Sequence, residues 1–207
     1  MRFVAVFFLS LCTLSFLAPA GAAQIRLNEF VADPASDWDG DGSVDSKLDE
    51  WVEVANTGTS SVDLSAYRLT DESAGTNYRF ALSGTLAPGE VAVFYGSVVV
   101  AWQSANGVSA FGLSLNNAGD TVYLYELTVT DTTVADSFAY GGAELADDRA
   151  LGRMPDGSGT WVVFDGLNPY SGTAFPATGC MPSPGEGVLC PTPVEASSWG
   201  RVKSLYR

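Results

Sequence analysis

The residues best suited to chemistry in this sequence lie in an acidic segment between positions 37 and 50. Counting Asp37 as loop position 1 places aspartates at positions 1, 3, 5 and 9 and Gly42 at position 6. This is the spacing of an EF-hand-type calcium loop, in which alternate side chains converge on one cation while the backbone coils around it. The predicted calcium ligands are Asp37, Asp39, Asp41, Ser43 (through its carbonyl), Asp45, Asp49 and Glu50.

The end of this loop departs from the EF-hand pattern. Leu48 stands at position 12, where an EF-hand has a bidentate glutamate, and Asp49 and Glu50 follow it directly. The sequence leaves open which of the two carboxylates closes the site. Because the flanking segments have strand character, we expect a structural calcium clip between two strands. The alternative is an acidic surface loop without a metal ion.

Paired carboxylates also permit a glycosidase-like acid and base, and Glu29, Glu50 and Glu53 are the candidates for a small secreted hydrolase. The sequence contains no histidine. This excludes Ser-His and Cys-His nucleophile pairs and imidazole metal sites. No catalytic residue is therefore assigned, and a binding or structural module is favoured over an enzyme.

The acidic side chains must be positioned by the rest of the chain. It consists of short runs rich in valine, leucine and aromatic residues, and these runs are separated by turns with Gly, Pro and Asn. Such runs are typical of strands in an antiparallel sandwich. The predicted strands are 25–31, 50–56, 67–71, 77–82, 90–96, 121–127, 133–140 and 159–164, and the best helix candidate is 98–106. In 50–56, alternation places Trp51 and Glu53 on one face and Val52 and Val54 on the other. The predicted fold class is all-β, with the acidic loop inserted after the first strand.

The two ends of the chain differ in amino-acid composition from the predicted sandwich at 24–175. Residues 1–23 have the short positive start, apolar run and small-residue cleavage site of a secretory signal peptide, which predicts a secreted or envelope protein. Residues 176–198 are rich in Pro, Gly and Ser and predict a linker or an irregular clasp, and 199–207 form a short aromatic and basic tail. Cys180 and Cys190, the two cysteines after the signal peptide, predict one disulfide in an exported protein.

The charge balance restricts the partners. The sequence has 24 acidic and 10 basic residues, and such a surface repels phosphate backbones and anionic lipids. Direct nucleic-acid binding is disfavoured, and no segment after residue 23 is long and apolar enough to span a membrane. The expected partner is an unidentified protein or glycan at the cell surface. The oligomeric state is left open.

Several motifs, taken in order, resemble a lamin tail domain of the bacterial, exported kind. They are LNEF at 27–30, DEWVEVANTGTSSVDLSAYRLTD at 49–71, LAPGEVAVFYG at 86–96, LSLNNAGDTVYLYE at 113–126, DSFAYGG at 136–142 and ALGRMPDGSGTWVVF at 150–164. The resemblance implies an immunoglobulin-like β-sandwich that is non-catalytic and mediates attachment. Within it we expect a tight turn at 116–120, and a hairpin in which Arg153 forms a positioning ion pair near Asp156 and Gly157.

Overall fold

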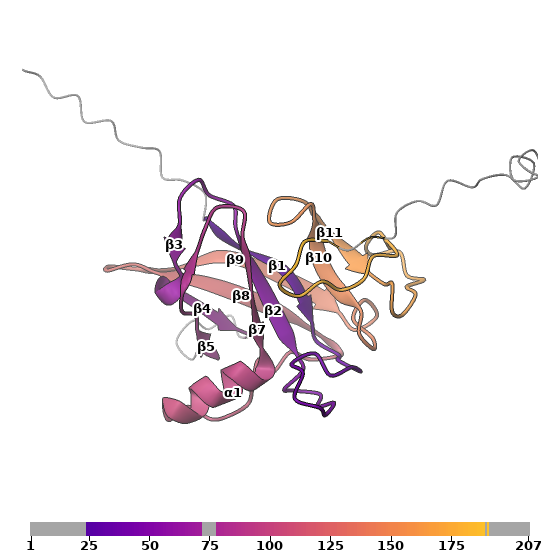
Figure 1. The fold of residues 1–207 in the computed structure, drawn as a ribbon, viewed down its shortest axis with the longest axis horizontal. Helices are drawn as coiled ribbons and strands as arrows, with labels where there is room; N and C mark the ends of the chain where they lie inside the picture. The colour runs from indigo at the N-terminus through magenta and orange to yellow at the C-terminus, as the bar shows by residue number, and fades with distance from the viewer. Residues whose placement is uncertain (1–23, 72–77, 189, 191–207) are drawn as a thin grey trace, which may run out of the picture.

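Two antiparallel β-sheets face each other in the computed structural model, which describes residues 24–71, 78–188 and 190 (Figure 1). The larger sheet has the order β11 (Thr160–Phe164), β10 (Ala150–Met154), β1 (Ile25–Val31), β2 (Trp51–Asn56) and β7 (Val91–Tyr95). The smaller sheet has the order β5 (Phe80–Ala81), β4 (Tyr67–Thr70), β8 (Gly119–Leu127) and β9 (Thr132–Gly141). A short ribbon pairs β3 (Val62–Asp63) with β6 (Thr85–Leu86). The predicted all-β sandwich is confirmed.

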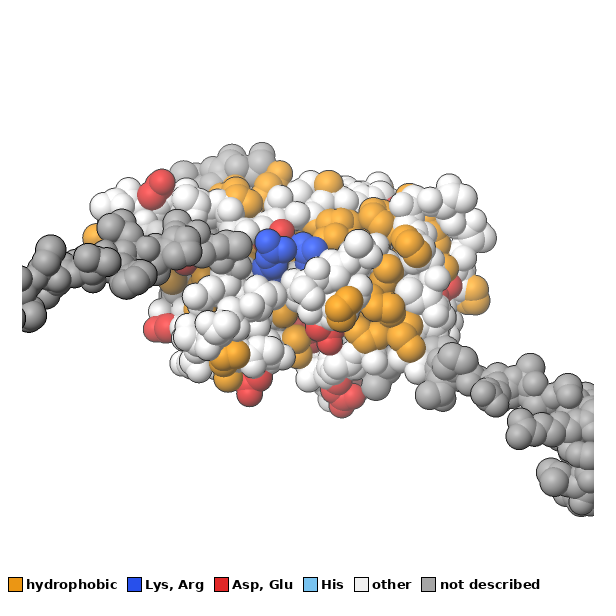
Figure 2. All heavy atoms as spheres, turned by 90° about the horizontal axis from the view of Figure 1, so that it is seen from above, with side chains coloured by type: hydrophobic (Ala, Val, Ile, Leu, Met, Phe, Trp, Pro, Cys, Tyr) orange, Lys and Arg blue, Asp and Glu red, His pale blue; other side chains and the backbone are white. Residues whose placement is uncertain are grey.

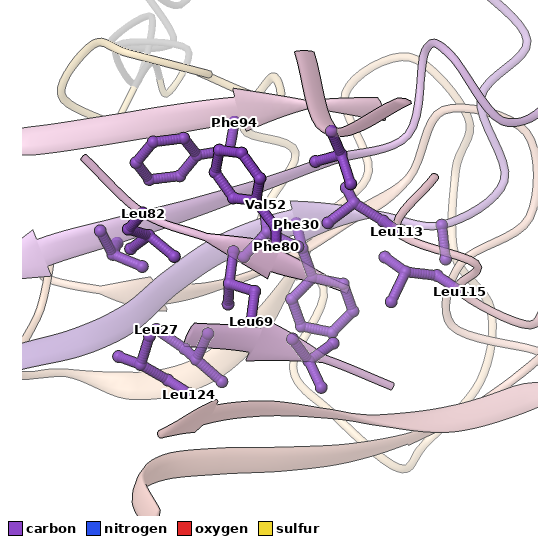
Figure 3. Packing of buried hydrophobic residues seen from close by; sticks show 14 of the residues in the cluster. Leu27, Phe30, Val52, Leu69, Phe80, Leu82, Phe94, Leu113, Leu115 and Leu124 are labelled. Atoms are coloured by element: carbon purple, nitrogen blue, oxygen red, sulfur yellow. The ribbon is translucent and has the colours of Figure 1, made fainter. Parts of the chain in front are cut away.

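The inner faces of the two sheets form the main core. Leu27, Phe30 and Val52 from the larger sheet meet Leu69 and Leu124 from the smaller one, and all of these side chains are buried. Figure 3 shows them pointing toward one another between the sheets. Removing this much apolar surface from water is the main force that holds the sheets together.

A β-bulge in β1 explains why its inward residues do not follow strict alternation. The register with β2 shifts between Leu27 and Glu29, so Leu27 and Phe30 both face the core. Beyond the bulge, Glu29 stands opposite Glu53 and Val31 stands opposite Trp51. An extra residue in one strand reverses the facing of everything that follows it. The bulge therefore places Glu29 and Val31 on the outer face of the larger sheet.

One helix, α1 (Gly96–Ala105), follows β7 directly and lies at the same end of the sandwich as the acidic loop (Figure 1). Buried Gln103 holds it there by donating hydrogen bonds to the carbonyls of Arg79 and Gly112, at 3.0 and 2.9 Å. Trp102 packs edge-on against Phe80 of β5. The helix predicted at 98–106 is confirmed, beginning two residues earlier than expected and ending one earlier.

The segment from Pro176 to Val188 covers the outer face of the larger sheet, and we call it the clasp. It begins beside β11, where Val163 donates a hydrogen bond to the Pro176 carbonyl at 2.9 Å. It is closed by the predicted disulfide between Cys180 and Cys190. Cys180 packs into a second apolar cluster with buried side chains of the larger sheet, among them Trp51. This part of the predicted 176–198 segment is thus a clasp and not a free linker.

Each predicted strand run overlaps a strand of the structure. The run at 77–82 pairs only over Phe80–Ala81, while β3, β6 and β10 lie outside the predicted runs. The predicted facing of β2 is confirmed: Val52 and Val54 join the inner core, and Trp51 joins the outer cluster. The predicted signal peptide (1–23) and C-terminal tail (199–207) lie outside the described residues.

Charged and apolar side chains occupy different places on the face of the molecule that Figure 2 draws. On the face drawn in Figure 2, acidic side chains lie at separate places, basic ones gather near the centre, and apolar ones form a patch toward one end. Within residues 24–71 and 78–188, no helix has both the length and the apolar character to cross a membrane. The acidic groups that do come together are in the loop and at the end of the sandwich beside it.

Candidate functional site

Three of the predicted ligands converge in the acidic loop between β1 and β2. Asp37, Asp39 and Asp49 each offer a carboxylate oxygen, and these oxygens lie within 4.8 Å of one another. Asp37 is exposed, Asp39 is half-buried and Asp49 is buried. Clustered carboxylate oxygens with one solvent-facing side are the donor set that a hard cation such as Ca²⁺ prefers.

The loop coils around the Asp37 carboxylate. Asp37 Oδ1 accepts hydrogen bonds from the amides of Gly40 and Asp41, at 2.8 and 3.1 Å, and its Oδ2 accepts one from Gly42 at 2.9 Å. Gly40 and Gly42 have φ values of 75° and 92°, a region that residues with a Cβ adopt with strain. The two glycines therefore permit the turn that brings Asp39 back toward Asp37.

Asp49 closes the loop from its far end. Its Oδ1 accepts hydrogen bonds from the amides of Trp38 and Asp39, at 2.7 and 3.0 Å, and its Oδ2 accepts one from Asp45 at 2.7 Å. One side chain thus joins the beginning, middle and end of the loop. Asp49 is the closing carboxylate of the cluster.

Two anchors outside the loop hold it to the sandwich. Asp148 accepts hydrogen bonds from the Ala35 amide at 2.7 Å and from Trp38 Nε1 at 2.8 Å. On the other side, the first amides of α1 cap the loop, since Gly96 donates to the Glu50 carbonyl at 2.7 Å and Ser97 to the Leu48 carbonyl at 3.0 Å. Sequence reasoning missed Asp148, because a residue so far along the chain shares no local pattern with the loop.

The remaining predicted ligands lie outside the three-carboxylate group. Asp41 accepts a hydrogen bond from the Ser43 amide at 2.8 Å, and Asp45 accepts one from Lys47 at 2.8 Å. The Lys47 and Leu48 amides lower the pKa of Asp45 below its ordinary value. Glu50 faces the interior of the sandwich, because neighbouring residues of an extended chain point to opposite sides.

Glu50 lines a pocket of about 400 Å³ at this end of the sandwich, where the two sheets separate. The pocket is lined by Ser46, Lys47, Glu50, Asp71, Ser114, Leu115, Asn116, Asn117 and Asp120. Strand alternation explains its carboxylates. Residues two apart in a strand point to the same face, so Glu50 shares a face with Val52, Asp71 with Leu69, and Asp120 with Val122. All three hydrophobic residues belong to the inner core. Acidic residues thus occupy inward positions at the ends of β2, β4 and β8.

Burial dominates the electrostatics of Glu50, which is 2% exposed. Desolvation raises its pKa to about 8, opposed by the backbone amides of Leu115 and Ser114. The Leu115 amide donates to Oε2 at 3.4 Å, the limit of a hydrogen bond. Glu50 is therefore a buried carboxylate with a long hydrogen bond from Leu115, and it faces a pocket.

The predicted turn at 116–120 forms the wall of the pocket. Gly119 donates a hydrogen bond to the Asn116 carbonyl at 2.9 Å, which confirms the turn. Asp120 Oδ2 accepts a hydrogen bond from the Asn116 amide at 3.2 Å. Asp71, on the opposite wall, forms a bidentate ion pair with Arg79 at 2.8 and 2.9 Å. Asp120 was expected to serve the turn at 116–120, and sequence reasoning did not place it in one pocket with Glu50 and Asp71.

A second buried acidic pair lies on the other side of the larger sheet, beneath the clasp. Glu29 accepts hydrogen bonds from the Ser183 amide at 3.0 Å and from its hydroxyl at 2.9 Å. Glu53 accepts hydrogen bonds from Asn28 Nδ2 and from the Gly185 amide, both at 2.6 Å. These bonds fasten the clasp to β1 and β2.

Burial also governs the ionisation of this pair. Desolvation raises the pKa of Glu29 well above its ordinary value, opposed by the Ser183 hydrogen bonds and assisted by the charge of Glu53. Desolvation raises the pKa of Glu53 to about 7, opposed by the hydrogen bonds from Asn28 and Gly185. Both carboxyl groups favour the protonated form more than exposed ones do.

The glutamates considered for hydrolase chemistry do not form one site. Glu29 and Glu53 lie under the clasp on the outer face, whereas Glu50 faces the pocket between the sheets. An acid and base for glycoside hydrolysis must flank one substrate bond from an open cleft. The arrangement therefore does not support the hydrolase alternative.

The expected ion pair at the β10–β11 hairpin was placed wrongly. The hairpin exists, but Arg153 forms its ion pair with Asp136 of β9, at 3.0 Å, and stacks over Trp161. Asp156 instead lies near Asn28, whose Nδ2 donates to it at 3.4 Å. Arg153 faces the second sheet, a direction that the local turn sequence does not reveal.

Fold and site together define an immunoglobulin-like β-sandwich with an acidic loop between its first two strands. The family model of the lamin tail domain matches residues 18–142, more than half of the chain, and the protein belongs to that family. The match ends before β10 and β11, which complete the larger sheet. Comparison with curated proteins and with solved structures finds no match.

Proposed function

We propose that this protein is an exported binding module whose lamin tail domain is stabilised by one calcium ion in the acidic loop. The observation that carries the proposal is the convergence of Asp37, Asp39 and Asp49 within 4.8 Å. The loop amides already hold these carboxylates in place, so a cation would find its ligands preformed. Asp41, Asp45 and the Ser43 carbonyl are near enough in sequence to complete the coordination.

The proposed role of the ion is structural. The loop joins β1 to β2, and its end is capped by α1. A cation shared by Asp37 and Asp49 would tie the beginning of the loop to its end and offset the repulsion among the carboxylates. We also propose that the protein is bacterial, acts at the cell surface, and binds a protein or glycan there. This part of the proposal rests on the signal peptide predicted from the sequence.

Calcium titration tests the metal. Trp38 contacts Trp51, with ring centroids 5.9 Å apart, and its amide binds Asp49, so tryptophan fluorescence should report loop ordering. At a free calcium concentration of about 100 times Kd, the ion should add about 2.7 kcal/mol of stability. For a domain of this size that corresponds to a rise in Tm of about 5–10 °C.

Matched variants locate the effect. Asp39→Asn keeps the size of a predicted ligand but removes its charge, and it should abolish most of the rise in Tm. Asp131→Asn, at the exposed turn between β8 and β9, should retain it. An unchanged Tm of the parent protein at about 10 mM calcium, above the range of weak extracellular calcium modules, would refute the calcium proposal.

The attachment role needs a separate measurement. The secreted protein should be retained on the producing cells or their envelope fraction when calcium is present, and EDTA should release it. A glycan array and a pull-down from the envelope, each with and without EDTA, would identify the class of partner. Uniform recovery in the culture medium under both conditions would contradict surface attachment.

A further inference from the structure

We propose that the pocket at the end of the sandwich binds the primary ammonium group of a lysine side chain presented by a partner protein. This rests on the proposed function, because it names the chemistry by which such a module would recognise its partner. The inward-facing carboxylates of Glu50, Asp71 and Asp120 lie at the ends of β2, β4 and β8 and line this pocket together.

Glu50 is the residue that points to a ligand. It is 2% exposed, and the Leu115 amide donates a long hydrogen bond of 3.4 Å to its Oε2. The Ser114 amide is a second backbone donor that lowers the pKa of this carboxyl group, against the larger effect of burial. A buried carboxylate costs free energy unless donors satisfy it. An entering group with several N–H donors would satisfy it from the pocket side.

The hydroxyl of Tyr140 is a buried polar group without a hydrogen-bond partner in the described chain, and it lies near the carboxylates of this pocket. Tyr140 stands opposite Asp120 in the β8–β9 register and is 7% exposed. Burial raises its pKa, and the charges of Asp120 and Glu50 raise it further, which places the hydroxyl close to both carboxylates. The Asn116 amide lowers the pKa of this hydroxyl but lies outside hydrogen-bond geometry.

The charge of the pocket favours a cation. Asp71 is compensated by its bidentate pair with Arg79. In the described part of the chain, neither Glu50 nor Asp120 has an ion pair. Among the residues that the structure describes, Lys47 is the basic side chain that lines the pocket; it is exposed, and its charge lowers the pKa of Glu50 without forming an ion pair. Two carboxylates thus remain for an incoming positive group.

The size and lining of the pocket favour an ammonium group on an aliphatic chain. The oxygens of Glu50, Asp71 and Asp120 do not form a group within 4.8 Å, as those of the loop do, so they do not surround one bare ion. A volume of about 400 Å³ admits a lysine side chain. Leu115 offers an apolar wall for its methylenes, and none of the described lining residues is an aromatic one that could stack on a sugar ring.

The acidic loop forms part of this pocket. Ser46 and Lys47 belong to the loop's closing arm, and Glu50 directly follows Asp49 of the three-carboxylate cluster. Ordering of this arm by the loop cation would fix the position of Glu50. We therefore expect calcium to strengthen binding of the ammonium ligand.

NMR titration of the mature protein with Nα-acetyl-lysine methylamide tests the proposal. Saturable shifts should appear at the amides of Ser114, Leu115 and Asn116, and Glu50→Gln should weaken binding at least tenfold. The matched control is Glu53→Gln, which alters a buried glutamate on the outer face of β2 and should leave the affinity within about twofold. Thermal melts confirm that both variants fold.

Ligand controls separate the sources of the ammonium group. The norleucine analogue, which has the aliphatic chain without the charge, should not bind. Glucosamine tests an amino sugar. Absence of saturable binding by the lysine ligand, equal binding by norleucine, preference for glucosamine, or full affinity in Glu50→Gln would each overturn the proposal.

Calcium separates this proposal from the preceding one. A rise in Tm with calcium but no lysine binding would leave the calcium clip intact and reject the pocket. Lysine binding without any response to calcium would support the pocket and reject the clip.

Discussion

Neutralising Glu53 should stabilise the protein near neutral pH and have little effect in mild acid. Its carboxyl group is fully buried beneath the clasp, and burial raises its pKa from 4.5 to about 7. Between these pH values the folded protein keeps a proton that the unfolded chain has lost. Stability therefore falls as pH rises from 4.5 to about 7 and levels off above it.

The size of the effect follows from the shift. One pKa unit is worth about 1.4 kcal/mol, so the shift of Glu53 corresponds to about 3 kcal/mol of lost stability above pH 7. In Glu53→Gln, the amide oxygen can still accept the hydrogen bond from Asn28, while the bond from Gly185 is lost at about 1 kcal/mol. The variant should be more stable than the parent by about 2 kcal/mol at pH 8, and within about 1 kcal/mol of it at pH 4.5.

Urea denaturation followed by tryptophan fluorescence at several pH values measures these differences. Glu186→Gln is the matched control, because Glu186 lies on the same clasp but is exposed, and its substitution should have no pH-dependent effect. A difference between Glu53→Gln and the parent that stays constant from pH 4.5 to pH 8 would refute the reasoning. It would mean that the hydrogen-bond donors fully offset the desolvation of the carboxylate.

Three further substitutions test how the site is held. Gly96→Ala should weaken the response to calcium, since a Cβ there would lie 1.8 Å from the Lys47 carbonyl oxygen; an unchanged calcium affinity would show that the loop end is not held by α1. Cys190→Ser opens the loop to Cys180, ten residues away, and should lower the free energy of unfolding by about 2–3 kcal/mol in a urea titration; reducing agent should then affect the parent only. Leu124→Ala, at a fully buried position, should cost about 2–5 kcal/mol, and a loss below about 1 kcal/mol would contradict its place in the core.

Most of the fold could be predicted from the sequence because strand formation in a sandwich leaves a local signature. The alternation in β2 separated Val52 from Trp51 correctly, and the apolar runs marked all but the shortest strands and β10. In contrast, β3 and β6 pair over two residues each, too few for a period to appear.

Part of the candidate site was also predictable. The calcium-loop spacing of Asp37, Asp39 and Gly42 depends on the backbone of one short loop, so it can be read from the sequence. The structure brings the two aspartates together with Asp49. The anchor Asp148 was not predictable, because its contacts with Trp38 span 110 residues.

What the sequence determined by itself was therefore local: the alternating strands, the acidic turn and its glycines, and the cysteine pair. Only the tertiary structure decided that Asp49 closes the loop while Glu50 faces the pocket, and that Arg153 pairs with Asp136. It also decided that residues 176–188 cover Glu29 and Glu53. The physical reason is that these contacts join elements far apart in the chain, whose meeting depends on how the two sheets pack.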